Sequence, residues 1–220
     1  MAVALAPGLI HHPGYLDGDA QAALAGQLAA ALRLAPPYTP RMPRTGRPFS
    51  VRMTNCGPLG WVSDEAGYRY QPTHPETGEP WPAIPGIARA AWDALARCAA
   101  PPEACLVNLY APTARMGLHQ DRDEAALDAP VLSLSLGAAA LFRYGGLRRG
   151  DPTRSVRLDP GDALVIGGPS RLMHHGIDRV LPAGTDLLAA RAPRPAFLPA
   201  GGRCNLTLRR VTAIPAPAAA

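Results

Sequence analysis

Residues 131–136 read VLSLSL, in which leucine and serine alternate strictly after the first residue. Side chains of a β-strand point alternately to its two faces, so the three leucines share one face and the serines the other. Further short strands, separated by Gly and Pro turns, are expected at 105–110, at 140–144, on both sides of the Pro-Gly-Asp turn within 155–168, and at 204–211. This series predicts a mainly β fold, a sandwich or jelly roll.

Two helices are expected before these strands. Residues 17–34 are rich in Ala and Leu, begin with Asp17 as a plausible N-cap, and are followed by a Pro-Pro pair that ends the helix. Residues 84–99 carry apolar residues at helical spacing. We expect both helices to pack on the outer face of the β structure.

The remaining segments are predicted to be irregular. Residues 36–60 should form a loop or an edge strand at the surface, and residues 189–202 a Pro- and Ala-rich loop before the last strand. Residues 61–82 contain aromatic residues among polar and turn residues, a setting in which they are not expected to be simple core: Trp61, Tyr68, Tyr70 and Trp81. The first of these segments is also basic: Arg41, Arg44, Arg47 and Arg52.

Every one of the 22 basic residues in this 220-residue chain is an arginine, and 17 acidic residues leave a net charge of +5. A hydrophobic content of 47% argues against a disordered basic tail. The positive charge is a weak indication of a polyanionic partner. The exclusive use of arginine fits either a chemical requirement or a GC-rich genome.

The sequence also bears on the compartment. The N-terminus lacks the positive region of a signal peptide, Pro7 interrupts its apolar run, and no apolar stretch reaches the length of about 18 residues that a membrane helix needs. The four cysteines are scattered and are expected to be reduced thiols. We therefore expect a cytoplasmic, monomeric protein without a membrane partner.

LHQDRDE at 118–124 is a candidate metal site, because His119 and Asp121 are two residues apart and would project from the same face of a strand. A pair of adjacent histidines, His174 and His175, follows later in the chain, past the Pro-Gly-Asp turn. Two histidines and one carboxylate on a β scaffold form the facial triad of non-haem Fe(II) oxygenases. The His-x-Asp pattern alone also occurs by chance, and either histidine of the pair can be the third ligand.

The last strand, RCNLTLR at 203–209, carries polar residues on one face: Arg203, Asn205, Thr207 and Arg209. Two buried guanidinium groups are costly unless an anion meets them, and a dicarboxylate would do so through bidentate pairs. Asn108 and Tyr110 could add neutral hydrogen bonds. The alternative is a solvated strand face, which the apolar residues on the other side make less attractive, although alternation alone does not say which face is inside.

Together with LFRYGGLRRGDP, LDPGDALVIGGPSRLMHHGI and MTNCGPLGW, these motifs resemble the AlkB family of DNA dealkylation proteins over about residues 50–211. The resemblance implies a double-stranded β-helix (jelly roll) at 101–212, N-terminal helices and a nucleotide-recognition lid within 1–100, and a tail at 213–220, all in one structural domain. It implies Fe(II) with 2-oxoglutarate and O₂ as co-substrates. By motif, the iron ligands are His119, Asp121 and His175, since the family's final ligand precedes Gly-Ile. The 2-oxoglutarate residues are Asn108, Tyr110, Arg203, Asn205 and Arg209.

The same resemblance implies oxidative demethylation of alkylated DNA, either single-stranded or with a flipped base, or of RNA. N1-methyladenine and N3-methylcytosine would be restored, with release of formaldehyde, succinate and CO₂. By motif, four residues shape the base pocket: Trp61, Tyr68, Asp123 and Arg149. A carboxylate at Asp123 would favour these cationic bases, and Trp61 offers a flat face for stacking. A core tryptophan and a carboxylate paired with Arg122 or Arg149 are the alternatives.

Two functions other than DNA demethylation are also compatible with the sequence. A 2-oxoglutarate oxygenase acting on RNA, protein or a metabolite would keep the iron and co-substrate residues but need not keep the four base-pocket residues as a set. A cupin-like binding module without enzyme activity would need no pair of arginines facing a metal. Residues 189–202 look like an insertion relative to the family and could change which nucleic acids fit.

Overall fold

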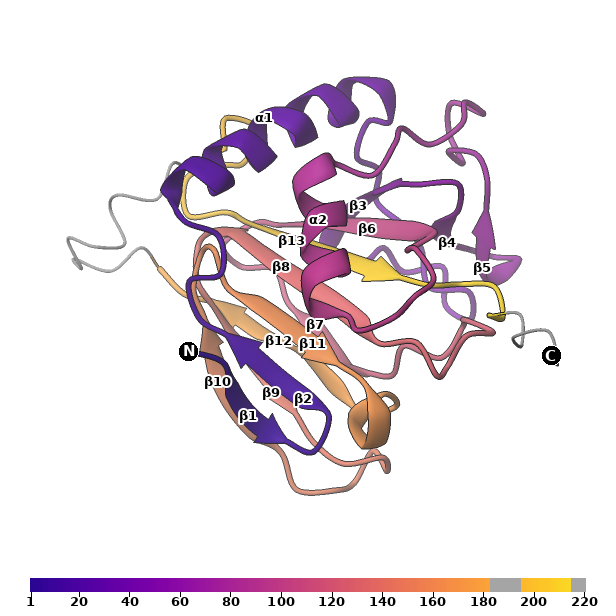
Figure 1. Ribbon diagram of the computed structural model, residues 1–220. Coiled ribbons are helices and arrows are strands. Elements are labelled where there is room, and N and C mark those ends of the chain that lie inside the picture. The colour runs from indigo at the N-terminus through magenta and orange to yellow at the C-terminus, as the bar shows by residue number, and fades with distance from the viewer. Residues whose placement is uncertain (183–194, 215–220) are drawn as a thin grey trace, which may run out of the picture.

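The computed structural model describes residues 1–182 and 195–214. Its described part is mainly β, with two α-helices, as the sequence predicts (Figure 1). Helix α1 (Gly18–Leu34) begins at Asp17, whose side chain accepts a hydrogen bond from the backbone N–H of Ala20. Helix α2 is shorter than predicted, Gly86–Leu95. No helix in this part of the chain is long and apolar enough to cross a membrane.

The larger sheet has seven antiparallel strands in the order β1-β2-β11-β8-β13-β6-β3. Their bounds, in chain order, are β1 (Val3–Ala6), β2 (Leu9–His12), β3 (Val51–Cys56), β6 (Ala104–Tyr110), β8 (Val131–Gly137), β11 (Ala163–Ile166) and β13 (Arg203–Arg209). The β1–β2 hairpin was not predicted from the sequence. β3 is the edge strand that the sequence allowed, but it is mostly buried.

The smaller sheet has the order β10-β9-β12-β7, and two further strands form a separate hairpin. The bounds are β7 (Met116–His119), β9 (Ala140–Tyr144), β10 (Arg154–Leu158) and β12 (His175–Val180) in the sheet, and β4 (Gly60–Asp64) and β5 (Gly67–Gln71) in the hairpin. The Pro-Gly-Asp turn does join two strands, but β10 and β11 belong to different sheets. The turn therefore carries the chain from one sheet to the other and does not close a hairpin.

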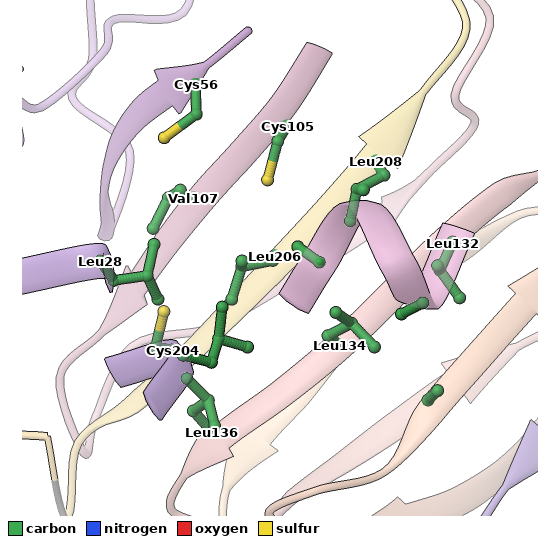
Figure 2. Close-up of a cluster of buried hydrophobic side chains, with 14 of the residues drawn as sticks. Leu28, Cys56, Cys105, Val107, Leu132, Leu134, Leu136, Cys204, Leu206 and Leu208 are labelled. Carbon is green, nitrogen blue, oxygen red and sulfur yellow. The ribbon is translucent and has the colours of Figure 1, made fainter. Parts of the chain in front are cut away.

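Two apolar layers hold these elements together. One lies between the larger sheet and the two helices and contains Leu28, Leu134 and Leu206 (Figure 2). Trp92 of α2 belongs to the same layer. The other lies between the two sheets and contains Met53, Leu164, Phe142 and Ile177 among others. The helices therefore cover the outer face of the larger sheet, as predicted, and leave its inner face to the smaller sheet.

Residues 61–82 do not behave uniformly. Tyr68 is exposed, but Trp81 is buried against Tyr38 and Val62, and its indole N–H donates to the carbonyl of Gln71. The expectation that these aromatics are not simple core is wrong for Trp81, because it packs in a small apolar cluster with Val62 of β4 and with Ala35 and Tyr38, which follow α1. The predicted loop at 189–202 and the tail at 213–220 lie partly outside the described residues. In the described part of the loop, Leu198 is buried.

Candidate iron and co-substrate site

One cavity of about 820 Å³ opens between the two sheets. All twelve residues that the sequence assigned to the site line it: Trp61, Tyr68, Asn108, Tyr110, His119, Asp121, Asp123, Arg149, His175, Arg203, Asn205 and Arg209. They come from both sheets, from the β4–β5 hairpin and from loops.

At the base of the cavity, His119, Asp121 and His175 each offer a ligand atom, and these atoms lie within 4.8 Å of one another. His119 and His175 face each other because β7 and β12 pair in register at these two residues. Asp121 Oδ1 lies 3.7 Å from His119 Nε2, and Asp121 Oδ2 lies 3.8 Å from His175 Nε2. His174, the alternative third ligand, is not part of this group.

Both imidazoles are oriented by backbone carbonyls. His119 Nδ1 lies 2.9 Å from the carbonyl of Gly117, and His175 Nδ1 lies 3.2 Å from that of Met173. A carbonyl only accepts, so each Nδ1 carries a proton, and Nε2 is the ring atom that faces the cluster and could bind a metal. This donor set fits a divalent iron ion, with two neutral imidazoles and one carboxylate on one face.

The protonation states also suit a metal. Burial, and then the neighbouring His119, lower the pKa of His175 from 6.5 to about 4. Burial alone would raise the pKa of Asp121, but Arg209 and the two histidines outweigh it and hold that pKa well below its usual range. At neutral pH His175 is therefore neutral and Asp121 ionised, which are the forms that bind a metal.

Asp121 is not placed as the sequence suggested. Strand β7 ends at His119, so Asp121 lies in the irregular segment beyond it and does not share a strand face with His119. Arg209 holds its carboxylate, with Nη2 2.9 Å from Oδ1 and Nε 3.3 Å from Oδ2. The ion pair with Arg209 of β13 therefore orients Asp121 toward the two histidines, which the i, i+2 spacing alone was expected to do.

The polar face of β13 points into the cavity, and Arg203 is its most buried member. Its side chain donates to Ser135 Oγ at 2.8 Å and to the carbonyl of Ala138 at 3.2 Å, and no carboxylate among the described residues lies within ion-pair distance of it. Within the described part of the chain, three buried side-chain atoms that line the cavity lack a hydrogen-bond partner: Arg203 Nε, Arg209 Nη1 and Asn108 Oδ1. A buried, unneutralised guanidinium with free donors fits an anionic co-substrate.

The base-pocket candidates lie at the mouth. Trp61 stacks on Tyr68, with ring centroids 5.5 Å apart and planes at 19°, and Phe49 meets Trp61 edge-on. Asp123 Oδ2 accepts a hydrogen bond from Trp61 Nε1 at 2.9 Å, so its partner is neither Arg122 nor Arg149. Arg149 donates to the carbonyl of Leu118 at 3.1 Å.

Three residues of the site were not predicted from the sequence as part of it: Tyr70, Glu124 and Arg171. Glu124 is buried, accepts hydrogen bonds from Arg171 Nη2 at 3.0 Å and from the hydroxyl of Tyr70 on β5, and forms an ion pair with Arg209 Nε at 3.3 Å. Glu124 and Arg171 stand within four residues of an iron ligand in the quoted motifs, which is the only signal the sequence offers. Their buried partners come from distant parts of the chain and cannot be read from spacing.

The cavity with its His-Asp-His cluster defines the centre of a non-haem iron oxygenase. A family model described as the 2OG-Fe(II) oxygenase superfamily matches residues 8–209. An alpha-ketoglutarate-dependent dioxygenase AlkB homolog from Caulobacter vibrioides is 50% identical over 204 residues, covering 93% of this chain and 88% of the relative. AlkB of Salmonella typhimurium is 48% identical over 145 residues, covering 64% and 67%.

The solved structure of OsALKBH1 superposes with a TM-score of 0.74 at 32% identity, covering 96% of this chain and 100% of that one. The chain belongs to the 2OG-Fe(II) oxygenase superfamily and, within it, to the AlkB family. It is a 2-oxoglutarate-dependent Fe(II) dioxygenase, with His119, Asp121 and His175 as the facial triad for iron.

Proposed function

We propose that this dioxygenase repairs alkylated DNA by oxidative demethylation of N1-methyladenine and N3-methylcytosine, releasing formaldehyde, succinate and CO₂. The observation that carries the proposal is that Trp61, which is stacked on Tyr68 and donates to the carboxylate of Asp123, lines the same cavity as the iron ligands. An aromatic face beside a negative charge suits a planar, cationic base. In this reading the chain forms a double-stranded β-helix, and the β4–β5 hairpin is part of the nucleotide-recognition lid.

The chain's own residues would bind and orient. Bound iron supplies the oxidising chemistry, with 2-oxoglutarate and O₂ as co-substrates. Arg203 and Arg209 would hold the two carboxylates of 2-oxoglutarate, with Asn108, Tyr110 and Asn205 around it. Trp61 and His119 would enclose the extruded base, and a base that cannot pair is cheaper to extrude than a normal one.

Rim arginines would hold the phosphate backbone. Arg115, Arg122 and Arg149 line the cavity, and the basic segment Arg41–Arg52 contributes Met42, Pro48, Phe49 and Ser50 to its mouth. Neutralising phosphates with arginine makes binding strongly salt-dependent. A tenfold or greater loss of oligonucleotide affinity between low and high salt is the expected behaviour.

The test is an incubation with a single-stranded oligonucleotide carrying N1-methyladenine, together with Fe(II), 2-oxoglutarate and ascorbate. Restored adenine and formaldehyde are expected. If 2-oxoglutarate is consumed in a coupled fashion only with RNA or another substrate, that second function replaces the first. D123A should keep iron but lose the preference for cationic over neutral adducts; a wild-type protein without that preference would remove this role from Asp123.

A further inference from the structure

The segment that carries Asp121 has no helix or strand of its own. Strand β7 ends at His119 and β8 begins at Val131, and the residues between them are turns and irregular backbone. A functional ligand has to be held to within about 0.5 Å of its working position. Since regular secondary structure does not hold Asp121, its position depends on contacts with other parts of the fold.

Arg171 supplies that support at three points of the segment. Its Nη1 donates to the backbone carbonyl of Asp121 at 2.6 Å, its Nη2 to the carboxylate of Glu124 at 3.0 Å, and its Nε to the carbonyl of Ala129 at 2.8 Å. The side chains of Arg171 and Glu124 are 4% and 2% exposed. Buried, charge-assisted hydrogen bonds from a rigid fork fix geometry better than any flexible side chain would.

The backbone of Arg171 is equally well placed. It ends the short 3₁₀ helix η1 (Gly168–Ser170), where its N–H donates to the carbonyl of Gly168 at 3.0 Å. Four residues later comes His175, and the carbonyl of Met173 between them orients the His175 ring. One short stretch, 168–175, therefore reaches both the second and the third iron ligand.

We propose that Arg171 is a positioning residue that sets the place of Asp121 relative to His175. Its hydrogen bonds go to the backbone carbonyls of Asp121 and Ala129 and to Glu124, and not to the iron ligand atoms or to the two proposed co-substrate arginines. It acts through the backbone of Asp121 and through Glu124, which also pairs with Arg209. The inference rests on the proposed function only through its iron chemistry and is independent of which base is repaired.

The competing explanation is that Arg171 only stabilises the loop. Metal affinity separates the two, because a residue that merely adds stability leaves the affinity of the folded protein unchanged. The comparison needs a control that loses stability elsewhere, and L28A provides it: Leu28 belongs to α1 and is fully buried in the apolar layer between the helices and the larger sheet, away from the cavity. Both proteins would be freed of metal and titrated with Co(II), followed by its visible absorption.

The expected result is that R171M binds Co(II) about 10- to 100-fold more weakly than wild type, as for other residues that orient metal ligands. R171K should fall between the two, because an ammonium keeps the charge opposite Glu124 but cannot reach all three acceptors. L28A should bind Co(II) as wild type does. If R171M does not fold, R171K decides, and it must show a several-fold loss.

Wild-type Co(II) affinity in folded R171M, or in R171K where R171M is unfolded, would overturn the proposal. An equal loss in L28A would do the same. The wild-type repair assay is read separately: if the methylated oligonucleotide is not repaired while the Co(II) results are as expected, the proposed DNA function fails and the role of Arg171 stands.

Discussion

The two faces of β13 are both buried, yet they are made of opposite chemistry. Cys204, Leu206 and Leu208 lie in the apolar layer under α1 and α2 (Figure 2). Arg203, Asn205 and Arg209 alternate with them and line the cavity between the sheets. The apolar face stabilises the fold, and the polar face costs stability and is positioned for binding an anion. One strand thus separates the part of the molecule that keeps it folded from the part that does chemistry.

The largest effect is expected at Asp121, which pairs with Arg209 at the end of the polar face of β13. D121A removes the only carboxylate of the facial triad, so iron binding and 2-oxoglutarate turnover should be abolished. Iron binding is measured by titration of the metal-free protein, and turnover by succinate release. D178A, which removes a carboxylate of β12 that pairs with Arg143 at 2.8 Å, is the control and should stay active. An active D121A enzyme would show that Asp121 is not an iron ligand.

Next in size is the loss of Arg203 from the same face. R203M should raise the KM for 2-oxoglutarate by about 30-fold or more, because it removes one partner of a buried charge pair. Stability should stay the same or increase, since an apolar side chain of similar size replaces an unneutralised buried charge. Initial rates and urea denaturation measure the two quantities.

R143M makes the same chemical change on the surface and should alter neither quantity by much. If R203M instead unfolds the protein at an unchanged KM, then Arg203 belongs with the residues that stabilise the fold.

The apolar face should show the reverse behaviour. L28A leaves a cavity in the layer that contacts Cys204 and Leu206, and should lower the free energy of unfolding by about 2–5 kcal/mol. The KM for 2-oxoglutarate of the folded protein should not change. A KM that rises together with the loss of stability would show that the apolar and polar faces of β13 do not act separately.

The smallest effect is expected just beyond β13, where Glu103 accepts from the backbone N–H groups of Val211 and Thr212 at 3.0 and 2.7 Å and pairs with Arg210. Burial alone would raise the pKa of Glu103, but the hydrogen bonds from Thr212 and the other contacts lower it below its ordinary 4.5. The carboxylate therefore contributes stability above about pH 4.5 that is lost as the pH falls through the lowered pKa.

E103Q should cost about 1 kcal/mol at neutral pH and less in acid. Urea denaturation at several pH values measures this. A cost that does not shrink on acidification would show that the charge of Glu103 is not what matters.

Part of this division could be read from the sequence. The alternation in 131–136 and 203–209, the Asp17 helix start and the His-x-Asp motif depend on neighbouring residues, so they predicted the strands, α1 and two of the iron ligands. The β1–β2 hairpin was missed because its short strands carry little periodicity. Glu124 and Arg171 were missed because what makes them important is burial beside distant partners.

By itself, the sequence determined that the chain is mainly β, that leucine and arginine take opposite faces of the last strand, and that two histidines and an aspartate are available for iron. Which face of that strand meets the helices and which the cavity was decided only in the tertiary structure, because alternation fixes the two sides of a strand but not what covers them. The tertiary structure also decided how Asp121 is held. Its segment has no regular geometry, so its position depends on Arg209 and Arg171, which reach it from other parts of the fold.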